Sequence, residues 1–334
     1  MSKQDDPRLG SIIKSGEDGD IVLIGFPYDE GTLRNGGRGG AHKSPTVFRY
    51  FLSKMGCLAN YEYMVDLSRI SISDAGDVAL GADSLEQAHQ QLRSTVRRVL
   101  SQGKIPFVVG GSNDQSSSNG LALLDILDDE GVEKDGEKVE MGCVNIDAHL
   151  DVRPRVPASA RNSPPLIHSG CPFRDLLEDG RLLGKNFVEF AAQGSQCSGE
   201  HARYLYQHKS KIVWLSEIRA PENSCEKSFA KVLKHLEGND QEGAAKKRAL
   251  FVSFDIDSIS GSDCPGVSCP STVGLSAEEA LSIARLSGAC GSVRLFDMSE
   301  MNVAIEDYRT PRLAVNIFYH FLIGYARRMD YKLE

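Results

Sequence analysis

Short apolar runs recur along the chain and alternate with longer segments in which apolar residues repeat at helical spacing. Several of these runs are nearly continuous, which is typical of strands in a parallel sheet that is covered on both faces. A further short strand is predicted near Ile70–Ser73. The main strands are predicted at Ile21–Pro27, Ile105–Val109, Met141–Ile146, Phe187–Ala191, Lys211–Leu215, Ala249–Phe254 and Ser292–Phe296.

The segments between these runs predict helices with one apolar and one charged face. The alternation of strands and helices favours one α/β sheet, doubly wound, within a single domain over residues 1–334. An eight-stranded α/β barrel is the alternative, and the uneven spacing of the elements disfavours it. Helices are predicted at Ser84–Gln102, Asp114–Leu127, Cys225–Leu236, Ser276–Leu286 and Thr310–Arg327.

The composition is that of an ordinary globular protein, with 334 residues of which 41% are hydrophobic and 25% charged. A net charge of −8 argues against nucleic acid as a partner, because phosphate binding needs a basic face. No apolar run reaches the roughly 18 residues that indicate a membrane span. The chain has eight cysteines and no CxxC pair, and its first residues are polar and lack a signal-peptide core. These features predict a reduced cytoplasmic protein. Cys264 and Cys269 are either ordinary thiols or a redox-sensitive loop.

Two acidic segments follow predicted strands, DAHLD at 147–151 and DID at 255–257. Residues two apart in an extended chain point to the same side, so we expect Asp147, His149 and Asp151 to converge, and likewise Asp255 and Asp257. Four buried carboxylates would repel one another strongly, and a metal cluster removes that problem.

Two more polar segments follow predicted strands, GGSNDQS at 110–116 and a strand end at Glu300. Sites in parallel α/β sheets form outside the carboxyl ends of the strands, so these segments are expected beside the acidic ones. A phosphate-binding glycine loop is the competing interpretation of 110–116. The absence of both GK[ST] and GxGxxG patterns argues against a nucleotide.

In this order, the glycine turn, the two acidic segments and Glu300 resemble the ureohydrolases, a family that includes arginase, agmatinase and formiminoglutamase. The resemblance extends from GFP at 25–27 and NGGRGGA at 35–41 through Glu300. It implies an arginase-like fold, a three-layer α/β/α sandwich around a parallel eight-stranded sheet, and a cluster of two Mn²⁺ ions.

The resemblance also implies a ligand set. Asp147 and Asp255 match the bridging carboxylates, Asp151 matches a ligand of one ion, and His149 and Asp257 match ligands of the other. The mostly oxygen donors suit Mn²⁺ better than Zn²⁺. Two ions sharing a hydroxide would supply a nucleophile at neutral pH, and Asp257 or Asp151 could pass its proton to the leaving nitrogen.

The sequence departs from the family pattern at Asn113, where most members carry a histidine. The amide oxygen of Asn113 would be a neutral, weak metal ligand. Asp114 is an alternative ligand if the turn is shifted by one residue, and a third interpretation is that Asn113 only caps the next helix.

Residues around the acidic segments indicate the substrate. Arg153 follows Asp151 by two residues, and the segment SGCPFR at 169–174 is close to the SGTPFR of formiminoglutamases, so Arg153, Arg174 and Ser169 are predicted to bind substrate. An arginine pairs well with a carboxylate through its bidentate fork, and Arg174 could instead cap a helix or pair with a nearby acid. His168 is a candidate for proton transfer only if its loop is offset, and Glu300 could pair with a protonated formimino nitrogen.

The sequence therefore predicts a manganese-dependent formiminoglutamase that splits N-formimino-L-glutamate into L-glutamate and formamide, in histidine degradation. Its partner would be a small amino-acid substrate, with no membrane or nucleic acid, and the resemblance suggests a homotrimer or homohexamer. The alternatives are a guanidino hydrolase of arginase or agmatinase type, and a metal-free relative that acts as a binding or scaffold protein.

Overall fold

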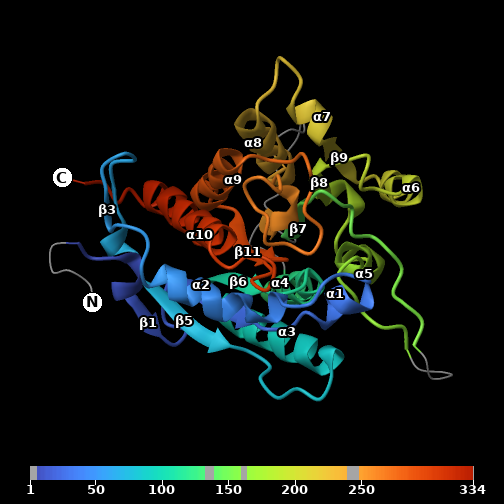
Figure 1. Cartoon of the computed structure of the whole chain (residues 1–334), viewed down its shortest axis with the longest axis horizontal. Helices are drawn as coiled ribbons and strands as arrows, with labels where there is room; N and C mark the ends of the chain where they lie inside the picture. The colour runs from blue at the N-terminus through green and yellow to red at the C-terminus, as the bar shows by residue number, and fades with distance from the viewer. Residues whose placement is uncertain (1–5, 132–138, 159–163, 239–247, 334) are drawn as a thin grey trace.

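A nine-stranded sheet runs through the middle of the molecule in the computed structural model, which describes residues 6–131, 139–158, 164–238 and 248–333 (Figure 1). Its strand order is β1-β5-β2-β6-β11-β10-β7-β8-β9, and all of its neighbouring strands are parallel. A small antiparallel pair stands apart from it, β3 (Ala59–Asn60) and β4 (Val65–Asp66).

The strands predicted from apolar runs are confirmed, with ends that agree to within three residues for all but the short run at Ile70–Ser73. That run marks only the start of β5. The strands of the large sheet are β1 (Ile13–Ser15), β2 (Ile21–Phe26), β5 (Ile72–Asp77), β6 (Ile105–Gly110), β7 (Glu140–Ile146), β8 (Phe187–Ala192), β9 (Lys211–Trp214), β10 (Arg248–Asp255) and β11 (Val293–Ser299).

Helices cover the sheet on both faces. One hydrophobic core joins the sheet to α2 (Ser44–Leu52), α8 (Cys225–Leu236), α9 (Ala277–Ala289) and α10 (Arg309–Arg328). The other joins it to α3 (Leu85–Ser101), α4 (Gln115–Glu130), α5 (Pro172–Asp179) and α6 (Gly199–Gln207). The shorter elements include α1 (Glu30–Arg34), α7 (Leu215–Ile218) and the 3₁₀ turn η5 (Ile256–Ser258).

The three-layer α/β/α architecture predicted from the resemblance is confirmed, and the barrel alternative is wrong because the sheet is open, with β1 and β9 at its edges. The sheet has nine strands among the described residues instead of eight, since the short edge strand β1 pairs with β5. β1 is three residues long and partly exposed, so it leaves no buried apolar run in the sequence.

Local sequence signals explain where the helices begin. Ser84 caps α3 by accepting a hydrogen bond from the backbone N–H of Gln87. Ser276 and Glu279 form a capping box at the start of α9, in which each side chain accepts from the other residue's backbone N–H. The five predicted helices are confirmed with ends within three residues. No described helix is both long and apolar enough to cross a membrane.

Helices α9 and α10 approach each other closely because glycines stand at their contact. A methyl group on Gly288 would overlap the carbonyl oxygen of Phe321, and one on Gly324 would overlap that of Arg285. The two backbones therefore touch where any larger residue would hold them apart.

We expect Gly288→Ala to destabilise the fold by about 1–3 kcal/mol, because the added methyl must push α10 away from α9. The gain in helix propensity of about 1 kcal/mol offsets part of this cost. Urea denaturation followed by circular dichroism measures the difference. The matched control is Gly291→Ala, because a Cβ there meets no atom within 4 Å. Equal stability of the two variants would contradict the packing described here.

Candidate metal centre

Four neighbouring strands in the middle of the sheet bring the polar segments together. The order β6-β11-β10-β7 places the ends of these strands side by side, and their parallel direction puts all four carboxyl ends at one edge. Asn113 follows β6, Glu300 follows β11, Asp255 ends β10 and Asp147 follows β7. The predicted convergence of the acidic segments is confirmed.

The first group of donors consists of Asp147, His149 and Asp257, whose ligand atoms lie within 4.8 Å of one another. Nδ1 of His149 is 3.2 Å from Asp147 Oδ1 and 3.4 Å from Asp257 Oδ2. Asp147 also accepts a 2.7 Å hydrogen bond from the backbone N–H of His149, which fixes the turn. One imidazole and two carboxylates can hold one cation here.

The second group shares Asp147 and adds Asp151 and Asp255, again within 4.8 Å. The reason for the convergence differs from the extended-chain argument. The chain bends after β7, and Asp151 adopts a left-handed backbone with φ of 38° that turns its side chain back to the cluster. Asp257 lies in η5, whose first turn is capped by Asp255 through the backbone N–H of Asp257.

The cluster is electrostatically unfavourable as a set of bare anions. Burial and neighbouring carboxylates raise the pKa of Asp151 and of Asp255 well above its usual value. Burial likewise raises the pKa of Asp257, and the charge of Asp257 raises the pKa of His149. The buried oxygen Oδ1 of Asp257 has no hydrogen-bond partner among the described residues. Crowded, desolvated carboxylates with an unpaired buried oxygen fit a pair of divalent cations.

Asn113 lies at the edge of the second group. Its side-chain Nδ2 is 2.8 Å from Asp151 Oδ2, and its Oδ1 is 2.9 Å from the hydroxyl of Ser299. Asp114 is not brought to the cluster, because its buried carboxylate pairs with His89 Nε2 at 2.6 Å on the side of α3. The alternative ligand Asp114 is therefore wrong for this fold.

Glu300 reaches the cavity from the end of β11. Its Oε1 accepts hydrogen bonds from Thr32 Oγ1 and from the backbone N–H of Asn113, both at 2.9 Å. Burial raises the pKa of Glu300 to about 8. Its backbone is left-handed, with φ of 65°, and its N–H donates to the carbonyl of Gly111. These contacts leave Oε2 without a protein donor among the described residues.

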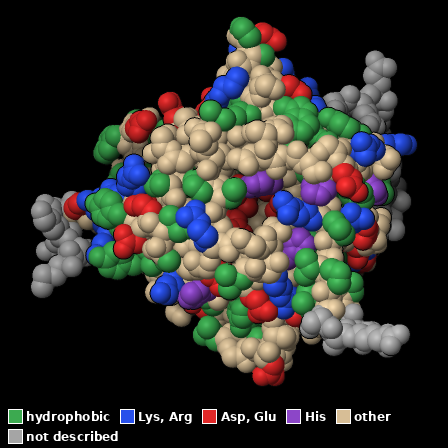
Figure 2. All heavy atoms as spheres, turned by 45° about the vertical axis from the view of Figure 1, so that its right-hand side comes forward, with side chains coloured by type: hydrophobic (Ala, Val, Ile, Leu, Met, Phe, Trp, Pro, Cys, Tyr) green, Lys and Arg blue, Asp and Glu red, His purple; other side chains and the backbone are tan. Residues whose placement is uncertain are grey.

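A cavity of about 280 Å³ opens above the cluster. Figure 2 shows its mouth as a hollow with acidic side chains at the floor and basic side chains on the rim. Seven of the predicted site residues line it: His149, Asp151, Arg153, Ser169, Asp255, Asp257 and Glu300.

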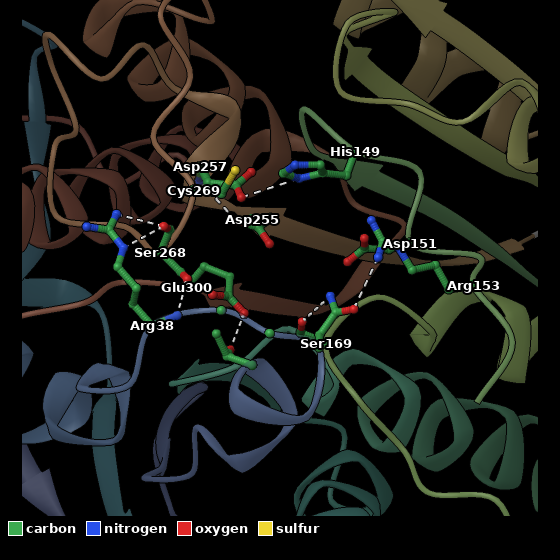
Figure 3. Close-up of a pocket in the computed structure, with 14 residues that line it drawn as sticks. Arg38, His149, Asp151, Arg153, Ser169, Asp255, Asp257, Ser268, Cys269 and Glu300 are labelled. Atoms are coloured by element: carbon green, nitrogen blue, oxygen red, sulfur yellow. Dashed lines mark hydrogen bonds and ion pairs between the residues drawn. The ribbon is translucent and has the colours of Figure 1, made fainter. Parts of the chain in front are cut away.

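Two arginines stand on opposite sides of this cavity (Figure 3). Arg153 donates to Asn35 Oδ1 at 3.3 Å, and Asn35 Nδ2 donates to Ser169 Oγ at 3.0 Å. Arg38 is held by the backbone carbonyl of Ser268 through Nε and Nη2, at 3.0 and 2.7 Å. An acidic floor below two guanidinium groups can hold cations at depth and an anionic group at the entrance.

Four predicted site residues do not line the cavity: Asp147 and Asn113 are buried within and beside the donor groups, and His168 and Arg174 lie away from them. His168 is buried with both ring nitrogens engaged, Nε2 by the carbonyl of Pro154 and Nδ1 by the backbone N–H of Gly170. Arg174 pairs with Glu178 one turn along α5 and lies over the ring of Tyr204. The structure places these two side chains in structural contacts outside the cavity.

Sequence reasoning missed part of the lining. Asn35, Gly37 and Arg38 belong to the NGGRGGA segment, in which an arginine between two glycine pairs is the signal that could have marked a site. Thr32 gave no signal in the sequence. Of the two cysteines singled out, Cys264 is buried, whereas Cys269 is exposed in the cavity beside His149.

A model of the arginase family matches residues 19–324, which include both acidic segments and Glu300. The chain belongs to the arginase family. The match covers all the strands of the central sheet except β1, and every residue of the two donor groups.

Solved and curated members of the family resemble this arginase-family chain over nearly its whole length. A formiminoglutamase of Trypanosoma cruzi, solved with Mn²⁺, is 47% identical, covers 97% of this chain and 100% of its own, and superposes with a TM-score of 0.84. An asparagine-to-histidine variant of the same protein, also with Mn²⁺, gives 46% identity, the same coverage and the same TM-score. A formimidoylglutamase of Rhodococcus opacus is 29% identical over 92% of this chain and 86% of its own length.

We expect the melting temperature of protein prepared without divalent cations to rise when the pH is lowered from about 8 to about 5.5. The carboxyl pKa values of Asp151, Asp255 and Glu300 are higher in the folded state than in the unfolded chain. The folded state therefore binds protons that the unfolded state has released, and stability is lost as the pH rises through the raised values.

Thermal melting at the two pH values measures this effect, and Glu300→Gln should reduce the difference because it removes one titrating group. Carboxyl groups whose pKa is lowered by ion pairs, such as Asp125, are ionised in the folded and the unfolded state above about pH 5. They therefore do not contribute to the pH dependence of the melting temperature over this range. A melting temperature that increases with pH over this range would contradict the crowding of the carboxylates.

Proposed function

We propose that this protein is a manganese-dependent formiminoglutamase that hydrolyses N-formimino-L-glutamate to L-glutamate and formamide. Water adds its oxygen to the formimino carbon, the bond between that carbon and the glutamate nitrogen breaks, and the nitrogen takes up a proton. The observation that carries the proposal is the combination of a buried carboxylate cluster with Arg153 at the rim of the same cavity.

Six residues would hold the two Mn²⁺ ions: Asn113, Asp147, His149, Asp151, Asp255 and Asp257. Their donors are mostly oxygens, which suits Mn²⁺ better than Zn²⁺. When bound, the ions would supply Lewis acidity and lower the pKa of water at the cluster. The likeness to a solved formiminoglutamase with Mn²⁺ supports this assignment.

The chain's own residues provide for proton transfer and orientation. Asp151 and Asp257 border the cavity and could carry a proton to the leaving nitrogen. Oε1 of Glu300 is fixed by two donors, so its Oε2 is positioned to accept a hydrogen bond from a protonated formimino nitrogen. His168 has no part in this scheme, since both of its nitrogens are engaged elsewhere.

The rim would select the substrate by charge. N-formimino-L-glutamate carries two carboxylates, and Arg153 offers a guanidinium to one of them beside the hydroxyl of Ser169. Arg38 stands on the opposite side, with Nε and Nη2 bonded to the protein and Nη1 without a partner among the described residues. A cationic substrate such as agmatine would meet two positive charges at this entrance.

The sequence offers two alternative functions. A guanidino hydrolase of arginase or agmatinase type would use the same cluster, and the arginines at the rim disfavour it. A metal-free binding or scaffold protein would fit the neutral Asn113, but such a protein would keep four crowded carboxylates together with only His149 as a cationic partner among the donors.

A single catalytic domain over residues 1–334, a cytoplasmic location and a homotrimer or homohexamer remain predictions from the sequence. Gel filtration with light scattering would measure the oligomeric state. Arg174, which pairs with Glu178 outside the cavity, could reach a substrate only if it left that ion pair.

The substrate assignment is tested by a panel assayed with and without Mn²⁺. We expect glutamate release from N-formimino-L-glutamate that depends on Mn²⁺, and little urea from arginine or agmatine. Faster urea release from either compound would favour a guanidino hydrolase. Absence of Mn²⁺ binding in calorimetry near pH 8 would favour the scaffold function.

We expect Arg153→Ala to lower kcat/KM for N-formimino-L-glutamate by a factor of about 10–100, because a lost charge-assisted hydrogen bond costs about 1.5–3 kcal/mol. Arg155→Ala is the matched control, since Arg155 lies two residues further along the same loop and pairs with Asp175. An unchanged kcat/KM for Arg153→Ala would remove this residue from the binding site.

A further inference from the structure

A buried polar network lies behind Asn113, on the side away from the cavity. Oγ of Ser116 is 3.0 Å from Asn113 Oδ1, 2.9 Å from Asp297 Oδ2 and 3.1 Å from Ser253 Oγ. Oγ of Ser299 is 2.9 Å from the same Asn113 Oδ1. Every member of this network is buried.

The number of protons in the network decides which bonds can form. Ser116 has one hydroxyl proton and cannot donate to both Asn113 and Asp297. Burial raises the pKa of Asp297 to about 6, so near pH 8 it is a carboxylate and can only accept. A charge-assisted bond is about twice as strong as a neutral one, so the proton of Ser116 goes to Asp297. Ser116 then turns a lone pair towards Asn113.

The Asn113 amide can satisfy that lone pair in only one of its two orientations. The oxygen and nitrogen of an amide occupy nearly the same places, and the surrounding hydrogen bonds decide between them. With Oδ1 towards Ser116, two acceptors face each other. With Nδ2 there, the amide donates to the hydroxyl oxygens of Ser116 and Ser299, and both contacts are favourable.

The second orientation has a consequence on the cavity side. The amide oxygen then occupies the position 2.8 Å from Asp151 Oδ2, where two oxygens repel each other unless a cation lies against both. The buried network and the cavity are thus satisfied together when a metal ion or a proton lies between these two oxygens.

We propose that Asp297, acting through Ser116 and together with Ser299, fixes the Asn113 amide in the orientation that presents its oxygen to a cation shared with Asp151. The proposal rests on the proposed function, because it takes Asn113 as a metal ligand. A histidine ligand is commonly fixed by a partner that holds its second nitrogen. Asp297 and the two serines do the same for an asparagine, which is a weak ligand with a competing orientation. They are positioning residues and touch no substrate.

The test is Mn²⁺ titration of Ser116→Ala and Asp297→Asn, followed by calorimetry and by the electron paramagnetic resonance signal of coupled Mn²⁺ pairs. We expect the affinity for one ion to fall by a factor of about 10–100 and the coupled signal to be lost at Mn²⁺ concentrations that saturate the unchanged protein. Affinity for the ion held by His149 and Asp257 should stay unchanged. Asp297→Asn nearly preserves shape, so it covers the case in which Ser116→Ala does not fold.

Ser112→Ala is the matched control, because Ser112 is a buried serine of the same turn whose hydroxyl has no hydrogen-bond partner among the described residues. It should bind both ions as the unchanged protein does. Equal loss of both ions in Ser116→Ala and Asp297→Asn, or no loss of either, would overturn the proposal.

Asn113→Ala separates this proposal from the function on which it rests. If the unchanged protein binds two ions and Asn113→Ala binds both equally well, Asn113 is not a ligand and the proposal fails while the function stands. If the unchanged protein binds no Mn²⁺, the proposed function itself fails.

Discussion

Mutual repulsion among buried carboxylates is the constraint on which the site depends. Asp147, Asp255 and Asp257 are nearly inaccessible to solvent, and Asp151 lies against them at the ends of two adjacent strands. Burial and charge together raise the pKa of Asp151, Asp255 and Asp257. Such a set is stable only with bound protons or with divalent cations, and the fold holds the donors ready for the cations.

The sheet supplies the rigidity that this arrangement needs. The donors extend from β10 and β7, and Glu300 and Asn113 from the neighbouring strands β11 and β6, all covered by helices on both faces. Backbone strain is present at this edge, where Asp151 and Glu300 adopt left-handed conformations. The packed core can hold such strain because β7 and β10 are buried along nearly their whole length.

Charge changes sign between the floor of the cavity and its rim. Carboxylates at the floor favour cations, whereas Arg153 and Arg38 on opposite sides of the entrance favour an anionic group (Figure 3). Asn113 adds a neutral amide to a set of four carboxylates and one imidazole, and an amide has two competing orientations, so its orientation has to be fixed by neighbours. This division lets one pocket bind divalent cations at depth and an acidic amino-acid derivative above them.

The sequence by itself determined the layered α/β fold and the acidic donors. Apolar runs and the segments DAHLD and DID are local patterns, which can be recognised without knowledge of the tertiary structure. It indicated the convergence of Asp147, His149 and Asp151, although the cause is a bend with a left-handed Asp151 and not an extended strand. Only the tertiary structure decided that Asp114 turns to His89, that His168 is locked by backbone partners, and that Arg38 faces Arg153. The pairing of Asp114 with His89 joins residues 25 positions apart, that of His168 with Pro154 joins residues 14 apart, and Arg38 and Arg153 are more than 100 apart, so no local pattern records these outcomes.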